Sequence, residues 1–178
     1  MNIVLFGMKA CGKTSVGKAL KDLIGKAFFD TDQLIREIYS FSGEKHLNIK
    51  EIYAKVGPAT FRGLEIEAVN SLQDVRNSII AVGGGTMLDS DNIETLQTFG
   101  HLVYLYIEQD KLKKRIFSSK DLPLIFDPKD PEGSFDAMYE QRYAWFKKIP
   151  SLVIEQADFT PKEIAKVIQE EIEKDGKQ

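Results

Sequence analysis

A short glycine-rich segment near the N-terminus has the residue types and spacing that bind phosphate groups. Residues 7–14 read G-M-K-A-C-G-K-T, a full match to the phosphate-loop pattern G-x-x-x-x-G-K-[ST]. In that pattern the backbone N–H groups cradle phosphates, Lys13 reaches the terminal phosphates and the Thr14 hydroxyl ligates Mg²⁺. The segment predicts a nucleotide site lined by Ala10, Cys11, Gly12, Lys13, Thr14 and Ser15.

The sequence on both sides of this loop predicts the strand and the helix that the pattern requires. Residues 3–6 read I-V-L-F, an apolar run of the kind found in buried parallel strands. After the loop, apolar residues recur at helical spacing as far as Ile24, and Gly25 is a residue type that ends helices. This order favours a nucleotide site over a chance glycine turn, because the positive end of the helix dipole also attracts phosphate.

Four further apolar runs alternate with helical patterns along the chain. The last helix opens with T-P-K-E at residues 160–163, a capping box with proline at the first helical position. Strands that alternate with helices predict an α/β fold, with a five-stranded parallel sheet flanked by helices. The length of 178 residues fits a single domain, 1–178. The four runs are residues 27–29, 79–82, 102–107 and 152–154.

Two carboxylates, Asp30 and Asp32, follow the second predicted strand in the triplet D-T-D. Ligands of open parallel sheets bind beyond the carboxyl ends of the strands, so these groups are expected beside the phosphate loop. In an extended segment, residues two apart point to the same side. One carboxylate would hold Mg²⁺ through water, and the other would orient or deprotonate an attacking hydroxyl. The alternative is that Thr31 or Asp32 only caps the next helix.

Three glycines, Gly83, Gly84 and Gly85, follow the third predicted strand at the same edge of the sheet. Glycine lets a ligand approach the backbone closely, and the N–H groups of the turn can bind it. The alternative is a strand-to-helix turn that binds nothing.

Two arginines lie in sequence contexts that permit either a binding role or an ordinary surface role. Arg62 stands three residues before Glu65, and Arg142 follows Glu140 closely. A guanidinium held by a carboxylate can grip the carboxylate of a ligand. A surface ion pair of little energetic value is the alternative.

Two long segments interrupt the alternation of strands and helices. The first, at about residues 33–74, has helical character and is interpreted as a substrate-binding subdomain. The second, at about residues 117–134, contains Pro123, Pro128 and Pro131 and several charges. We interpret it as a lid rather than a disordered loop, because phosphoryl transfer requires water to be excluded from the site.

Composition excludes several classes of protein. The net charge of −3 and the lack of a basic cluster argue against a nucleic-acid partner. No apolar run is long enough to span a membrane and no signal peptide is recognised. The single cysteine, Cys11, fits a reducing cytoplasm, and a monomer is expected. Because it precedes Lys13 and a helix N-terminus, Cys11 is either a reactive, exposed thiol or a small residue with its sulfur turned inward.

Taken together, these motifs resemble the shikimate kinase family over nearly the whole chain and in the same order. The resemblance implies the nucleoside monophosphate kinase type of P-loop fold, with a substrate subdomain and a lid. It also implies phosphorylation of a shikimate ring hydroxyl by Mg·ATP, which gives 3-phosphoshikimate. The matching elements are G-M-K-A-C-G-K-T, D-T-D at 30–32, F-R-G-L-E at 61–65, G-G-G-T at 83–86, Arg115, L-P-L at 122–124, and Arg142.

The resemblance assigns the nucleotide and metal residues. It implies that Gly12 and Lys13 cradle the ATP phosphates, with Lys13 also catalytic. It implies that Thr14 ligates Mg²⁺, that Asp30 approaches the metal through water, and that Arg115 stacks on the adenine.

The resemblance also assigns the shikimate residues. It implies that Asp32 binds the ring hydroxyls and acts as the base. Arg62 and Arg142 would grip the carboxylate, and the turn Gly83–Gly85 would contribute the backbone of its middle glycine, Gly84.

The chain departs from the family pattern at two places. Where the family has a lid arginine that contacts the ATP phosphates, this sequence has Leu122, with Lys120 nearby as a different kind of cation. Before F-R the family usually has Gly-Glu, whereas here Gly57-Pro58 starts a helix with a proline. These departures concern the rate rather than the fold or the substrate.

Three alternatives remain open. Another small-molecule kinase, such as a gluconate kinase, would share the loop and the fold but is not expected to combine D-T-D with two arginines. A GTPase would need N-K-x-D, which does not occur. A nucleotide-binding pseudoenzyme is supported only by the missing lid arginine.

Overall fold

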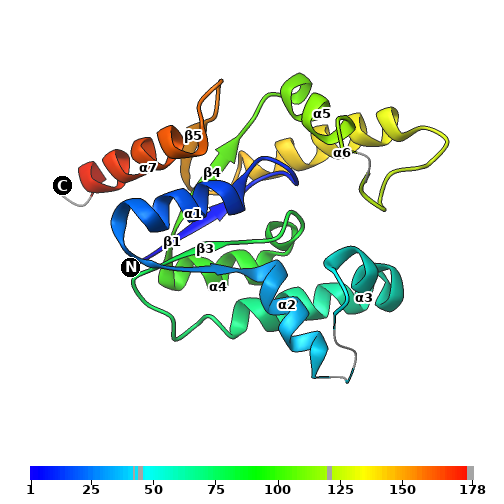
Figure 1. The fold of residues 1–178 in the computed structure, drawn as a ribbon, viewed down its shortest axis with the longest axis horizontal. Helices are drawn as coiled ribbons and strands as arrows, with labels where there is room; N and C mark the ends of the chain where they lie inside the picture. The colour runs from blue at the N-terminus through cyan, green and yellow to red at the C-terminus, as the bar shows by residue number, and fades with distance from the viewer. Residues whose placement is uncertain (42, 44–45, 120–121, 176–178) are drawn as a thin grey trace.

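The computed structural model describes residues 1–41, 43, 46–119 and 122–175 and contains one five-stranded sheet. All neighbouring strands pair in parallel, in the order β2-β3-β1-β4-β5. The predicted sheet and its strands are therefore confirmed, with ends that differ by one or two residues. The strands are β1 (Asn2–Phe6), β2 (Ala27–Asp30), β3 (Ser78–Ala81), β4 (Gly100–Tyr106) and β5 (Leu152–Glu155) (Figure 1).

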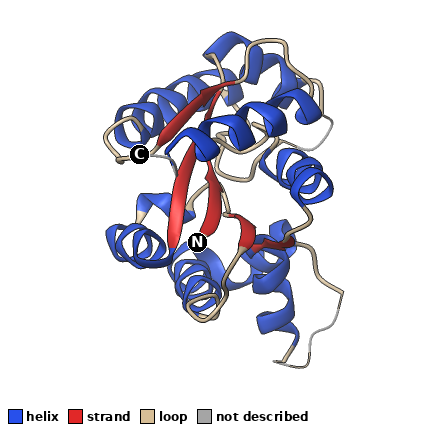
Figure 2. Cartoon of the chain, turned by 90° about the vertical axis from the view of Figure 1, so that its left-hand side faces the viewer, coloured by secondary structure: helices blue, strands red, loops and turns tan. Residues whose placement is uncertain are grey.

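Helices cover the sheet on both sides (Figure 2). Helix α1 (Lys13–Ile24) follows β1 and packs against α7 (Pro161–Asp175), and every residue of β1 is buried. Helix α7 begins with the predicted capping box, in which the Thr160 and Glu163 side chains each bond the backbone N–H of the other residue. The covering helices are α1 (Lys13–Ile24), α4 (Ser90–Phe99), α5 (Gln109–Phe117), α6 (Pro131–Phe146) and α7 (Pro161–Asp175), with a 3-10 turn η1 (Thr86–Leu88) after β3.

The segment predicted as a substrate subdomain forms α2 (Thr31–Ser40) and α3 (Ile49–Asn70), which pack together at one end of the molecule (Figure 1). They enclose an apolar cluster of their own, centred on Ile35, Ile52 and Phe61 and separate from the cluster around the sheet. The backbone of Gly57 is non-helical, with φ 77°, and Pro58 restarts the helix after it, as the sequence predicted. This small second core holds α2 and α3 together beside the edge of the sheet.

The segment expected to be an irregular lid is shorter than predicted. Its last residues, 131–134, are the first turn of α6, which Asp130 caps by accepting the Gly133 N–H and which starts with Pro131. Proline, charge and glycine in this stretch are therefore signals of a helix start, misread as signs of a broken loop. The connection between α5 and α6 is limited to residues 118–130, of which 120 and 121 lie outside the described residues.

Among the described residues, no helix combines the length and apolar character needed to cross a membrane.

Candidate active site

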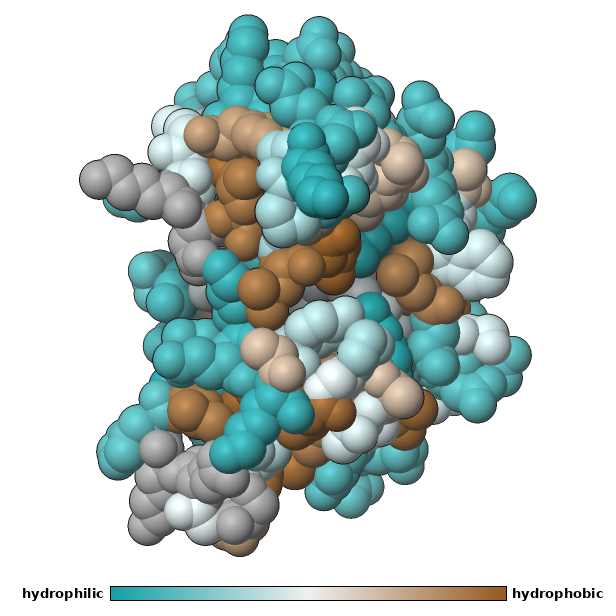
Figure 3. Space-filling view, turned by 90° about the vertical axis from the view of Figure 1, so that its right-hand side faces the viewer, coloured by the Kyte–Doolittle hydropathy of each residue, from teal (hydrophilic) through white to brown (hydrophobic). Residues whose placement is uncertain are grey.

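A cleft of about 470 Å³ lies at the carboxyl ends of the strands, between the phosphate loop, α3 and residues 123–125 of the connection between α5 and α6. Most residues predicted for the site line it, from Ala10 and Gly12 through Asp30 and Asp32 to Arg142. The face that carries α3 and the lid shows apolar side chains gathered around its middle, with polar side chains toward the edges (Figure 3). The T-shaped pair Tyr53 and Phe61 gives α3 an apolar wall in the cleft.

The phosphate loop has the geometry that its sequence predicts. Gly7 has a φ of 147°, and a β-carbon there would lie 2.7 Å from the carbonyl oxygen of Leu105, so a larger residue would push the loop off β4. Gly12, with a φ of 97°, starts α1. The Lys13 ammonium lies within the loop and donates to the carbonyl oxygens of Gly7 and Met8 at 3.0 and 2.8 Å.

Cys11 is fully buried, so the expectation of an exposed thiol is wrong and the alternative of an inward sulfur is confirmed. Its side chain belongs to the core around the sheet and does not line the cleft, and its N–H bonds the carbonyl of Met8 at 3.2 Å. The backbone of the loop turns the Cys11 side chain inward. The nearness of Lys13 and of a helix N-terminus in the sequence does not reveal this direction.

We therefore expect Cys11 to resist alkylation in the folded protein. Its labelling by iodoacetamide should be at least about 100-fold slower than in guanidinium-unfolded protein, because the sulfur is reached only through local opening. Peptide mass spectrometry over a time course measures both rates. Rapid, stoichiometric labelling of the native protein would show that the sulfur is accessible after all.

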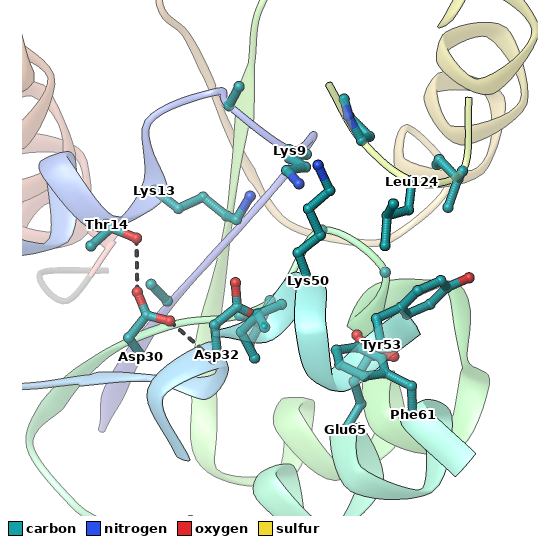
Figure 4. Close-up of a pocket in the computed structure, with 18 of the residues that line it drawn as sticks. Lys9, Lys13, Thr14, Asp30, Asp32, Lys50, Tyr53, Phe61, Glu65 and Leu124 are labelled. Carbon is teal, nitrogen blue, oxygen red and sulfur yellow. Dashed lines mark hydrogen bonds between the residues drawn. The ribbon is translucent and has the colours of Figure 1, made fainter. Parts of the chain in front are cut away.

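Asp30 joins the phosphate loop to the start of α2. One of its carboxylate oxygens accepts the Thr14 hydroxyl at 2.7 Å, and the other accepts the Asp32 N–H at 3.0 Å (Figure 4). Asp30 is thus the cap of α2, and the alternative in which Thr31 or Asp32 caps it is wrong. The extended D-T-D geometry is also wrong, because Asp32 already lies in the first turn of α2. Both carboxylates nevertheless line the cleft.

The hydroxyl of Thr14 and the carboxylate of Asp30 suit Mg²⁺, which prefers oxygen ligands. Within the described part of the chain, no group of three or more His, Cys, Asp or Glu could hold a metal alone. Two oxygen ligands beside a phosphate loop fit a Mg²⁺ ion that takes its other ligands from nucleotide phosphates and water.

Asp32 sits where a carboxylate is poorly solvated. Burial, and after it the negative charge of Asp30, raises the pKa of Asp32 to about 6, while Lys13 and Lys9 oppose this rise. A carboxylate with a pKa close to neutrality is a better proton acceptor than an exposed aspartate and is still ionised at pH 7.

The glycine turn mainly makes room for other parts of the protein. A β-carbon on Gly85 would collide with the Arg62 guanidinium, and one on Gly83 would lie 2.9 Å from an oxygen of Asp32. The Gly83 N–H is already bonded to the Thr31 hydroxyl at 2.8 Å, so this residue positions the site without lining it. Gly84 and Gly85 do line the cleft, and their role toward a ligand stays a prediction.

The two arginines meet around a buried carboxylate. Arg62 pairs with Glu65, whose side chain is 2% exposed and also accepts the Thr86 hydroxyl at 3.0 Å. Arg142 donates to the carbonyl of Gly84 at 3.0 Å. Burial, and then the positive charge of Arg62, lowers the pKa of Arg142, while burial raises the pKa of Glu65. The Arg62–Glu65 contact is therefore no surface pair, and the two guanidinium groups leave an excess positive charge in the cleft.

Two further positions from the sequence lie away from the cleft. Arg115 is exposed in the last turn of α5, and Leu122 packs against the apolar core around the sheet. Neither lines the cleft, and Lys120 lies outside the described residues.

Sequence reasoning missed several residues that line the cleft. Lys9 stands within the phosphate loop at a position that the pattern leaves free. Lys50 and Tyr53 come from the first turns of α3, where the sequence resembles any amphipathic helix. Leu124 and Ile125, from the connection between α5 and α6, also line the cleft.

Comparison with known proteins gives a consistent result. The sequence model described as "Shikimate kinase" matches residues 9–173. A shikimate kinase from Nitrosospira multiformis is 32% identical over 171 residues, which cover 96% of this chain and 84% of the relative. One from Alkaliphilus oremlandii is 33% identical over 168 residues, or 94% and 96% of the two chains.

Solved structures agree with the sequence relatives. The structure of shikimate kinase from Acinetobacter baumannii in complex with shikimate superposes with a TM-score of 0.86 at 28% identity, covering 98% of this chain and 93% of that one. A gluconokinase from Sinorhizobium meliloti, at a TM-score of 0.57 and 17% identity over 93% and 87% of the two chains, shares the fold alone. The motifs, the cleft and these comparisons agree: the chain belongs to the shikimate kinase family.

Proposed function

We propose that this protein transfers the γ-phosphoryl group of Mg·ATP to a ring hydroxyl of shikimate and forms 3-phosphoshikimate. One observation carries the proposal: a single cleft joins the phosphate loop and Asp32 to the pair Arg62 and Arg142. A substrate with a carboxylate at one end and a hydroxyl at the other fits between them. Family membership and the neighbour solved with shikimate support the same substrate.

The residues divide the work by chemistry. Arg62 and Arg142 hold the carboxylate through charge-assisted bonds, and Glu65 fixes the first guanidinium. Asp32 accepts the hydroxyl proton as the oxygen attacks phosphorus. Lys13 stabilises the negative charge on the phosphate oxygens. The apolar lid residues Leu124 and Ile125 help to exclude water.

The proposal includes Mg²⁺ as the metal of the nucleotide. Thr14 and Asp30 would hold it, as direct ligand and through water respectively. When bound, Mg²⁺ neutralises charge on the β- and γ-phosphates. Arg115, by the family resemblance, would contact the adenine from outside the cleft described above.

The proposal also covers the setting in which the enzyme works. We expect a monomer in the cytoplasm, without a nucleic-acid partner. The single cysteine supports the cytoplasmic location, and the net charge of −3 supports the lack of a nucleic-acid partner.

The pKa of Asp32 leads to a pH prediction. Only the ionised carboxylate can accept the proton, so kcat/KM for shikimate should fall about tenfold per pH unit below about pH 6 and level off above pH 7. A pH series from 5 to 8 at saturating Mg·ATP, with circular dichroism at each pH as the folding control, measures this. A profile that stays flat down to pH 5 in folded protein would exclude Asp32 as the base.

A coupled assay of ADP release tests the proposed function. We expect fast release with shikimate and Mg·ATP, and little above background without shikimate or with gluconate in its place. ADP release that depends on gluconate would instead support the sugar-acid kinase alternative. No ADP release with either substrate would support the pseudoenzyme.

A further inference from the structure

The lid of this protein brings no positive charge into the part of the cleft that the structure describes. The lid residues that line the cleft are Pro123, Leu124 and Ile125, all apolar. Leu122, at the position where the family has an arginine, packs against the core. A transferring phosphoryl group carries negative charge that must be stabilised, so positive charge is expected from the walls of the cleft.

Two lysines extend into the cleft from opposite walls. Lys9 comes from the phosphate loop, and its backbone lies against the glycine turn, since a β-carbon on Gly84 would be 3.2 Å from the Lys9 nitrogen. Lys50 is the second residue of α3. Figure 4 shows Lys13, Lys9 and Lys50 directed toward the same region of the cleft.

Lys50 lies in the first turn of α3, whose backbone is held by a capping box. Asn48 and Glu51 form a full capping box at the start of α3, with bonds of 3.0 and 2.7 Å to each other's backbone N–H groups. The first turn is therefore rigid, and the positive end of the helix dipole lies next to the lysine. Lys9, for its part, lies close enough to Asp32 to oppose the rise in the pKa of that carboxyl.

Positive side chains outnumber carboxylates in the described lining of the cleft. Five cationic side chains, Lys9, Lys13, Lys50, Arg62 and Arg142, face three carboxylates, Asp30, Asp32 and Glu65. The arginines are placed for a carboxylate at the far side, and Lys13 belongs to the nucleotide loop. Lys9 and Lys50 are two further cationic side chains that line the cleft between these groups.

We propose that Lys9 and Lys50 together bind the transferred phosphoryl group from fixed walls of the cleft. This inference rests on the proposed function and adds a selectivity to it. The pair contributes little to shikimate, which carries no charge at that end. It contributes strongly to the transition state and to phosphorylated shikimate, which carry a phosphoryl group there.

The test compares Lys9→Met, Lys50→Met and the double variant with the unaltered enzyme. Methionine keeps most of the length of lysine and removes the charge. Both lysines are at least partly exposed, so the variants should fold, which thermal melting checks. Lys55→Met, an exposed position on the same helix outside the cleft lining, is the matched control.

We expect each single variant to lower kcat about tenfold and the double variant about 100-fold, with the KM for shikimate changed less than threefold. Calorimetry should show that the affinity for shikimate 3-phosphate falls at least about tenfold while that for shikimate is kept. Lys50→Arg should retain most of both properties, and Lys55→Met should resemble the unaltered enzyme.

Three results would overturn the inference. In the first, both single variants keep kcat and the ratio of product to substrate affinity within twofold. In the second, only one lysine matters, which removes the paired role. In the third, the affinities for shikimate and its phosphate fall equally, which indicates a structural role. Absence of shikimate-dependent ADP release by the unaltered enzyme would instead overturn the proposed function, and this inference with it.

Discussion

Replacing Asp32 with asparagine should abolish turnover of shikimate while leaving ATP binding intact. Asparagine keeps the shape of the side chain but cannot accept a proton, and a positioned general base contributes about 10²–10⁴-fold to the rate. The loss of one negative charge near the phosphate loop should leave ATP binding unchanged or slightly tighter. The measurement is kcat in the coupled assay together with the Kd for Mg·ATP by calorimetry.

The matched control is Asp22→Asn, on the exposed face of α1, which should retain normal kcat. The capping of α2 does not confuse the result, because Asp30 rather than Asp32 supplies the cap. A near-normal kcat for Asp32→Asn would mean that the proton leaves by another route and that Asp32 only lines the cleft.

Loss of either arginine should weaken shikimate binding far more than ATP binding. A charge-assisted bond to a carboxylate contributes on the order of 2–3 kcal/mol, so Arg142→Ala should raise the Kd for shikimate roughly 30- to 150-fold. Arg62→Ala should have at least as large an effect, because it also leaves Glu65 buried without its guanidinium partner. Calorimetry with shikimate and with Mg·ATP measures the two affinities separately.

The double variant Arg62→Ala with Glu65→Gln separates binding from folding. It removes the buried charge together with its partner, so thermal stability should recover relative to Arg62→Ala while shikimate binding stays weak. Arg76→Ala, at an exposed arginine outside the cleft lining, is the control for loss of charge alone. Equal losses of shikimate and ATP binding in Arg142→Ala would indicate general disruption of the cleft.

The parts of this protein that follow local rules could be predicted from its sequence. The phosphate loop, the stop at Gly25 and the capping box at Thr160 each depend on neighbouring residues, and each appears as expected. The parallel direction of the strands follows from the alternation of strands and helices. The sheet edge at which the motifs meet could therefore be predicted as well.

Features that depend on tertiary packing could not be predicted in the same way. Whether the Cys11 sulfur turns toward the cleft or the core depends on the packing of the loop over β1 and β4. The alternative in which Thr31 or Asp32 caps α2 lies one or two residues too late, because the last residue of β2, Asp30, is also the cap of α2. Lys50 carries no signal in its local sequence, since only the placement of α3 beside the phosphate loop brings it into the cleft.

The identity of the reaction product tests the central claim most directly. The enzyme is incubated with Mg·ATP and shikimate, and the product is analysed by ³¹P and ¹H nuclear magnetic resonance. We predict one new phosphate monoester whose phosphorus couples to a single ring proton, that of the carbon bearing the 3-hydroxyl, formed in step with ADP. An unphosphorylated ring, with ADP and inorganic phosphate as the only products, would contradict the account.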